Sequence, residues 1–244
     1  MTDWQIAIET SMRQGSVALL EEDRTVRQTL LPADRRTAQT LSPAVAELLA
    51  SLPEPRRGIK LVSVAAGPGS FTGLRIGVTA AKTLAYALGC PVAPCDTLAA
   101  IIARTREACP DAETIDAAID AFRDQVFCRR ETRAGEVLVA SQALDRDQWL
   151  RSLSPGGATT GGGEPTILAC GNAWARTAAV PAGVRLASEE LWHPAAATIG
   201  MLGWRAHRRG ESIEPMRLRP DYLRESAAEE KAAQQTVSPT GSTP

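Results

Sequence analysis

The sequence has few histidines and lysines and no excess of positive charge. Its 244 residues include two histidines and three lysines, and 27 cationic side chains are offset by 28 acidic ones, for a net charge of −1. Such a chain has no global positive field with which to hold nucleic acid by counterion release. We therefore expect any RNA to be held mainly by a partner.

Long apolar runs and paired cysteines are also missing. The longest apolar stretch is far below the roughly 18 residues that would span a bilayer, and no basic segment opens the chain. The five cysteines include no C-x-x-C pair, which favours reduced thiols over a zinc or disulfide framework. The two histidines, His193 and His207, are 14 positions apart and so do not form a pair at ligand spacing. We expect a cytoplasmic protein with no membrane segment and no metal site.

The composition is that of a globular α/β protein, with 44% hydrophobic and 23% charged residues. The first half predicts three antiparallel strands, then helices alternating with buried strands. The expected elements are strands 4–9, 15–20 and 25–31, helix 37–51, strand 60–66, helix 73–88, strand 91–95 and helix 97–107.

The second half repeats this order. The expected elements are strands 114–119, 125–130 and 136–140, helix 146–153, strand 166–170, a helix beginning at Asn172 and helix 195–209. We therefore predict two similar lobes, residues 1–108 and 109–226, with the second including the C-terminal helices. Residues 154–165 are predicted to form a surface loop and 227–244 a disordered tail.

The stretch Ala66-Gly-Pro-Gly-Ser-Phe-Thr-Gly-Leu-Arg-Ile-Gly77 permits three interpretations. A glycine loop between a buried strand and a helix could bind an anion, although the Lys-Ser/Thr pair of a P-loop is missing. It could instead form a tight turn with Ser70 or Thr72 as the helix cap. Thirdly, Gly73, Gly77 and Ala81 form a face of little bulk that another helix could approach.

Four segments in order carry a specific resemblance. AAGPGSFTGLRIGVTAAKTLA resembles the signature of the bacterial TsaB family, also called YeaZ, and IAIETS with GSVALL resembles its opening. AAIDAFRDQVFC resembles the start of its second lobe, and RPDYLRE its close. The resemblance implies an actin-like (ASKHA, ribonuclease H-like) α/β fold with two lobes of mixed sheets flanked by helices.

The resemblance also implies a role in making tRNA threonylcarbamoyladenosine. The chain would be a non-catalytic partner subunit of a TsaD-like threonylcarbamoyltransferase, would contact a TsaE-like ATPase and would meet tRNA mainly through the complex. It would require no cofactor of its own, with ATP or ADP at the subunit junction. We expect the partner surface or anion loop, together with helix 37–51, to include Gly67, Pro68, Gly69, Ser70, Phe71, Thr72, Gly73, Arg75, Gly77 and Ala81. Without its partner the same surface would form a homodimer.

Two departures from the family pattern concern an alternative function. Glu9 stands where the family has Asp, at a position where actin-like ATPases hold metal and phosphate, and Phe122 stands where it has Arg. Glu9, Thr10 and Asp120 are the residues we expect near a nucleotide. The rival hypothesis is an actin-fold ATPase or phosphotransferase that acts alone through Gly67–Gly73 and Glu9. A metallopeptidase is a weaker rival because no histidine pair lies on helix 37–51.

The arginines between 205 and 224 leave a further question open. They form either a solvated face or an auxiliary tRNA contact. The sequence has three Phe and two Tyr, and these are not interleaved with the basic residues in the pattern typical of single-stranded RNA binding.

Overall fold

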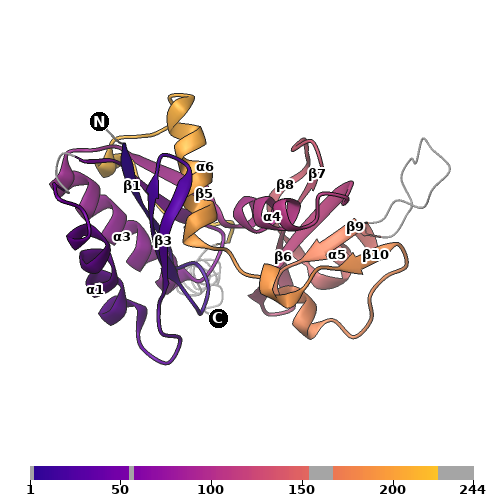
Figure 1. Cartoon of the computed structure of the whole chain (residues 1–244). Helices are drawn as coiled ribbons and strands as arrows, with labels where there is room; N and C mark the ends of the chain where they lie inside the picture. The colour runs from indigo at the N-terminus through magenta and orange to yellow at the C-terminus, as the bar shows by residue number, and fades with distance from the viewer. Residues whose placement is uncertain (1–2, 55–57, 154–166, 225–244) are drawn as a thin grey trace, which may run out of the picture.

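The first lobe is built on a five-stranded mixed sheet. The computed structural model describes residues 3–54, 58–153 and 167–224 (Figure 1). The strand order is β3-β2-β1-β4-β5, antiparallel from β3 to β1 and parallel from β1 to β5. The strands are β1 (Trp4–Glu9), β2 (Ser16–Glu21), β3 (Arg24–Leu30), β4 (Ile59–Gly67) and β5 (Val92–Asp96).

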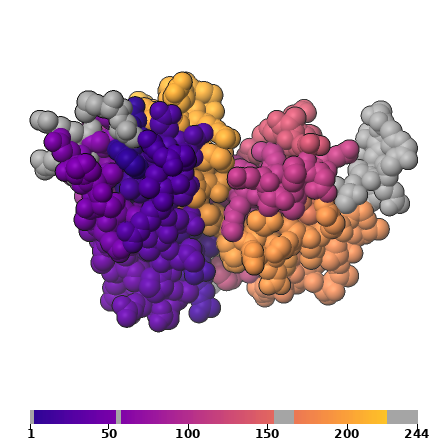
Figure 2. Space-filling model, in the orientation of Figure 1, coloured from indigo at the N-terminus to yellow at the C-terminus, as the bar shows by residue number. Residues whose placement is uncertain are grey.

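The second lobe repeats that topology. Its sheet has the order β10-β9-β6-β7-β8, with β6 antiparallel to β7, β7 antiparallel to β8, and β9 parallel to both β6 and β10. The strands are β6 (Thr114–Phe122), β7 (Gln125–Thr132), β8 (Val137–Asp145), β9 (Ile167–Cys170) and β10 (Val184–Leu186). Figure 2 shows the two lobes as separate masses with a notch between them. The predicted pair of similar α/β lobes is confirmed.

Helices cover both faces of the first sheet because its central strands are apolar on both faces. Ile6 and Ile8 face helices α1 (Thr37–Ala50) and α3 (Phe71–Leu88), whereas Ala7 faces α6 (Ala196–Arg208). In Figure 1, α1 and α3 lie on the side of this sheet that faces away from the second lobe. Among the described residues, no helix is both long enough and apolar enough to cross a membrane.

The ends of α3 follow from local chemistry. The Ser70 hydroxyl accepts a hydrogen bond from the N–H of Gly73 at 3.3 Å, so the predicted capping role of Ser70 is confirmed. Gly89 ends the helix in the left-handed conformation, with φ of 69°. The helix begins at Phe71, two residues before the predicted start.

The remaining short elements lie mainly in the second lobe. They are α4 (Thr97–Ala108), α5 (Arg146–Ser152) and the 3-10 turns η1 (Asn172–Arg176), η2 (Glu189–Leu191) and η3 (Pro215–Arg217). The helix expected from Asn172 is thus a single 3-10 segment. The predicted loop 154–165 and tail 227–244 lie outside the described residues.

The packing crosses the predicted lobe boundary twice. Leu98 and Ile101 of α4 belong to the apolar core of the second lobe, while Ile199 of α6 belongs to that of the first. The polypeptide therefore returns to the first lobe after completing the second, and residues 213–222 continue there. The division at residue 108 stays a prediction about chain order, because helix periodicity does not say which sheet a helix covers.

Candidate functional site

The glycine loop lies where β4 meets α3, at the inner end of the first sheet. Gly67 has a φ of 148°, and a Cβ atom added there would lie 2.2 Å from the carbonyl oxygen of Asp221. The loop is tied to the end of β1, since the N–H of Ser70 donates to the carbonyl of Ser11 at 2.7 Å. Glycine is thus required here by close backbone contacts within the chain itself.

The small-residue face of α3 is turned inward. A Cβ on Gly73 would lie 2.0 Å from the carbonyl oxygen of Thr10, one on Gly77 would lie 2.2 Å from the Thr10 hydroxyl, and Ala81 is fully buried. The Thr10 hydroxyl also donates to the carbonyl of Gly73 at 2.8 Å. The expectation that Gly73, Gly77 and Ala81 present an open surface to a partner is wrong, because β1 already occupies that face.

A cavity of about 810 Å³ separates the two lobes at this point. The predicted residues Pro68, Gly69, Ser70, Phe71, Thr72 and Arg75 line it from the first lobe. Asp120 and Phe122 line it from the β6–β7 turn of the second lobe. The structure therefore brings most of the glycine loop and Asp120 together, whereas Glu9, Thr10, Gly73, Gly77 and Ala81 lie behind the cavity wall.

Residues 218–224, the C-terminal segment of the described chain, also belong to the site, although they were not among the predicted site residues. The N–H of Asp221 donates to the carbonyl of Ala66 at 2.7 Å, and the Tyr222 ring stacks on Phe71 with centroids 4.8 Å apart. An Nη1 hydrogen bond of 2.8 Å joins Arg224 to the carbonyl of Ala121 in the second lobe. The RPDYLRE match was the signal that could have pointed to this segment. Residues 218–224 thus cross from the first lobe to the second over the glycine loop.

Arg75 lies in the first turn of α3, where the helix dipole disfavours a cation, and two contacts account for its position. Its Nε donates to the Tyr222 hydroxyl at 3.1 Å, and its guanidinium carbon lies 3.9 Å from the centroid of the Phe71 ring. Aromatic groups thus receive this cation.

Glu9 ends β1 as a fully buried carboxyl group. Its Oε1 accepts hydrogen bonds from the backbone N–H of Ser11 at 2.6 Å and from the Ser11 hydroxyl, while Oε2 has no hydrogen-bond partner. Burial raises the pKa of Glu9 to about 7, although the two Ser11 bonds act in the opposite direction. The carboxyl group therefore serves the local backbone, and its burial favours the protonated form.

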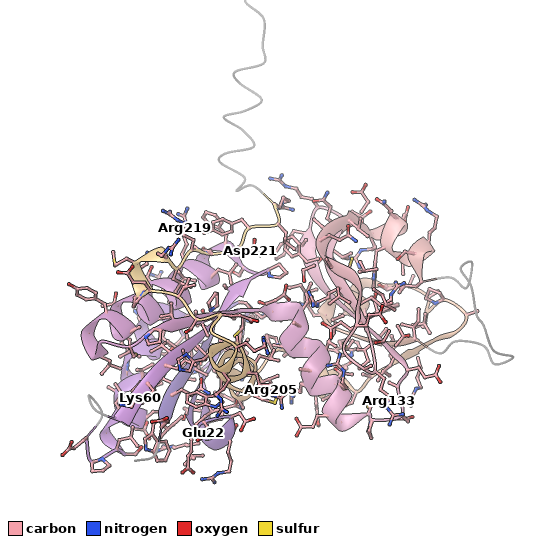
Figure 3. All side chains as sticks on the ribbon, turned by 90° about the horizontal axis from the view of Figure 1, so that it is seen from above. Glu22, Lys60, Arg133, Arg205, Arg219 and Asp221 are labelled. Carbon is pink, nitrogen blue, oxygen red and sulfur yellow. The ribbon has the colours of Figure 1, made fainter. Side chains whose placement is uncertain are left out.

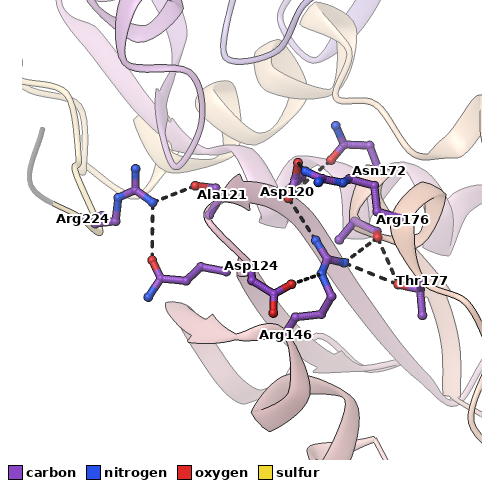
Figure 4. Close-up of polar contacts among 10 residues, drawn as sticks. Asp120, Ala121, Asp124, Arg146, Asn172, Arg176, Thr177 and Arg224 are labelled. Atoms are coloured by element: carbon purple, nitrogen blue, oxygen red, sulfur yellow. Dashed lines mark hydrogen bonds and ion pairs between the residues drawn. The ribbon is translucent and has the colours of Figure 1, made fainter. Parts of the chain in front are cut away.

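Asp120, near the end of β6, is held by two arginines (Figure 4). Its Oδ1 pairs with Nη2 of Arg146 at 3.0 Å and its Oδ2 with Nη1 of Arg176 at 3.1 Å. The backbone N–H of Asp120 donates to Oδ1 of Asn172 at 2.9 Å. Both carboxylate oxygens are therefore engaged within the second lobe.

Phe122, Arg123 and Asp124, which begin two positions after Asp120, form the β6–β7 turn and have φ values of 61°, 51° and 63°. Such left-handed backbone is costly for residues with side chains. Arg146 holds the turn, because its Nε contacts Oδ1 of Asp124 at 3.3 Å and its backbone N–H donates to the Asp124 carbonyl at 2.9 Å.

The residues present do not fit a magnesium nucleotide at the position that the actin-like resemblance suggests. Glu9 bonds Ser11 behind the cavity wall, and Asp120 is neutralised by arginines. Within residues 3–54, 58–153 and 167–224, no group of three or more His, Cys, Asp or Glu side chains is arranged to hold a metal ion.

The two lobes share one topology, and a glycine loop borders the cleft between them. This arrangement defines an actin-like two-lobed protein. A family model described as "TsaD: tRNA N6-adenosine threonylcarbamoyltransferase" matches residues 31–232. The chain belongs to this family and, by its relatives, to its TsaB (YeaZ) branch. YeaZ from Pseudomonas aeruginosa superposes with a TM-score of 0.71 at 27% identity, over 90% of this chain and 99% of that one.

Two curated relatives carry the name "tRNA threonylcarbamoyladenosine biosynthesis protein TsaB". The Bacillus subtilis protein is 32% identical over 151 residues, or 61% of this chain, and the Haemophilus influenzae protein is 31% identical over 129 residues, or 52% of it. The matches span 65% and 53% of those proteins, which is less than two thirds of their length.

Proposed function

We propose that this chain is a non-catalytic partner subunit of a TsaD-like threonylcarbamoyltransferase in the formation of tRNA threonylcarbamoyladenosine, and that it acts in the cytoplasm. It would also contact a TsaE-like ATPase, and tRNA would reach it mainly through the complex. The chain would need no cofactor of its own, and ATP or ADP would bind at the junction between subunits.

The observation that carries this proposal is that neither candidate carboxyl group faces the cavity as an unpaired charge. An ATPase of this fold needs acidic side chains that face metal and phosphate in the cleft, as the resemblance implies. Here Glu9 bonds Ser11 behind the cavity wall, and Asp120 is saturated by Arg146 and Arg176. A chain whose candidate carboxyl groups are engaged by its own residues in this way is suited to supporting another subunit.

The outward face of α1 and α3 is the surface we propose for the TsaD-like partner. Its exposed residues are mostly small, including Ala38, Ser42 and Ala46 of α1 and Thr79 and Thr83 of α3. Small side chains let partner helices approach closely, and Tyr86, at 73% exposure, supplies a large anchor at one end. Without the partner, a second copy would cover the same face as a homodimer.

Reconstitution tests the proposal. Unmodified tRNA, a supply of threonylcarbamoyl-adenylate and the TsaD-like and TsaE-like proteins are combined, and labelled threonine in tRNA is counted with and without this chain. We expect incorporation to require the chain, and the chain alone to give none. Equal incorporation without it would contradict the proposal.

A matched pair of variants locates the partner surface. Tyr86→Ala should weaken the complex with the TsaD-like protein at least tenfold, as for a buried aromatic anchor. Arg185→Ala, an exposed change in the second lobe, should leave it unchanged. The rival ATPase hypothesis predicts instead nucleotide turnover by the isolated chain that is lost in Glu9→Ala.

A further inference from the structure

All three phenylalanines of the chain and one of its two tyrosines line the cavity between the lobes. Phe71 comes from the start of α3, Phe122 and Phe127 from the β6–β7 hairpin, and Tyr222 from the C-terminal segment. Phe127 is buried, whereas Phe122 is 66% and Tyr222 37% exposed. The cavity mouth therefore presents aromatic rings from both lobes to solvent.

The exposure of Phe122 is built into the backbone. The residue has left-handed φ, as do the next two residues, and the contacts of Arg146 with Asp120 and Asp124 hold this conformation. Strained backbone that its surroundings over-determine is typical of functional sites. The exposed ring of Phe122 on this turn is therefore held in position to contact a ligand.

Cations surround these rings. Arg13 and Arg75 line the cavity, and within the described part of the chain neither pairs with a carboxylate, while Arg224 donates to the Ala121 carbonyl. Of the acids at the mouth, Asp120 is neutralised, which leaves Asp221. Figure 3 shows Asp221 and the nearby Arg219 where the C-terminal segment passes over the first lobe. The mouth thus carries excess positive charge on a chain with net charge −1.

We propose that this cavity mouth binds single-stranded RNA, with bases stacked on Phe122 and Tyr222 and backbone phosphates at Arg13 and Arg75. Exposed aromatic faces combined with arginines are how proteins hold unpaired bases and the adjoining backbone. The inference rests on the proposed function, since the RNA would be the unpaired anticodon loop of the tRNA substrate. It differs from the sequence-based expectation that a partner makes the main contact.

Binding by the isolated full-length chain tests the inference. A labelled anticodon stem-loop and a fully paired duplex of equal length are titrated by fluorescence anisotropy. We expect the stem-loop to bind more tightly than the duplex. Phe122→Leu, which keeps the apolar volume but removes the stacking face, should weaken stem-loop binding about fivefold or more, and Phe122→Tyr should retain it.

Tyr86→Leu is the matched control, because Tyr86 is an exposed aromatic on the face of α3 proposed for the partner. It should leave RNA affinity unchanged. Arg75→Gln should lower the slope of log affinity against log salt by about 0.7, as expected for one lost phosphate contact on a single strand. Circular dichroism spectra confirm that each variant is folded.

Several results would overturn the inference. They are absent stem-loop binding by the parent chain, equal affinity for the duplex, wild-type affinity in Phe122→Leu, or an equal loss in Tyr86→Leu. Displacement of the RNA by low concentrations of AMP would assign the mouth to a free nucleotide instead. Because these titrations contain no TsaD-like protein, they can fail while the reconstitution succeeds, and the reverse also holds.

Discussion

The two lobes place an acidic residue at the end of their first strands and neutralise it in different ways. Glu9 closes β1 beside Ser11, with no cation among its hydrogen-bond partners, and burial raises its pKa to about 7. Asp120, near the end of β6, is instead paired with Arg146 and Arg176. One lobe neutralises its carboxyl group by a proton, the other by two guanidinium groups.

This difference shows that equivalent positions in a duplicated topology need not keep equivalent chemistry. Neither carboxyl group is left free for a metal and phosphate, yet the two respond to different perturbations. The first lobe should respond to pH, whereas the second should respond to loss of an arginine.

Arg146→Met tests the ion-paired lobe and has the largest expected effect. Arg146 is buried, contacts both Asp120 and Asp124 and donates to the Ala173 carbonyl at 2.9 Å. Without it, Asp120 keeps a single cationic partner, the largely exposed Arg176. The free energy of unfolding should therefore fall by about 3–5 kcal/mol in urea denaturation. Arg185→Met, in an exposed pair with Asp111, should cost under about 1 kcal/mol. Equal losses would show that burial of the pair is unimportant.

Glu9→Gln tests the protonated lobe. Unfolded Glu ionises near 4.5, whereas the folded pKa is about 7, so the stability that the protonated group contributes is present at low pH and is lost as pH rises through that interval. The wild type should therefore lose about 3 kcal/mol relative to Glu9→Gln between pH 4.5 and 8. Urea midpoints across this range measure the divergence, and Glu47→Gln on the surface of α1 is the control. Parallel pH profiles for wild type and Glu9→Gln would contradict the raised pKa of Glu9.

Gly77→Ala sharpens the account of the first lobe. The new methyl group would lie 2.2 Å from the Thr10 hydroxyl, so that hydroxyl must move and give up its hydrogen bond to the Gly73 carbonyl, or α3 must shift. We expect a loss of about 2 kcal/mol in unfolding free energy, with a lower melting temperature. Thr79→Ala, on the exposed side of the same helix, should change stability by less than about 0.5 kcal/mol. Unchanged stability in Gly77→Ala would show that the Gly73/Gly77 face of α3 has room for a larger side chain and is not closed by Thr10.

Tyr222→Ala tests the link between the lobes and has the smallest expected effect. The substitution removes the stack on Phe71 and the hydrogen bond from Arg75, worth about 1 kcal/mol in all. Amide exchange at Asp221, whose N–H donates to Ala66, should become about fivefold faster, with little change in the global melting temperature. Unchanged exchange at Asp221 would show that Tyr222 does not hold the segment.

The secondary structure was largely predictable, because apolar periodicity is a local property. Strands β1, β2 and β6 and helices α1, α4 and α6 lie within a few residues of the predicted ranges. The segment from Asn172 was predicted as a helix, but it forms one 3-10 turn.

Within the candidate site, prediction reached the glycine loop and Asp120 but not the contacts that give them their roles. Helical spacing identified the small face of Gly73 and Gly77 without saying what covers it. The covering residue, Thr10, directly follows β1, so only the packing of α3 against the end of that strand could show that the face is internal.

The sequence by itself determined that the chain has two similar α/β lobes, a glycine loop that leads into a helix and a family resemblance that carries the function. Only the tertiary structure decided that α4 and α6 cross between lobes and that four aromatic residues meet at one cavity. Arg75 and Tyr222 are 147 positions apart, yet they share a hydrogen bond. Such pairs are set by how the lobes dock and where the chain returns, and local patterning contains neither.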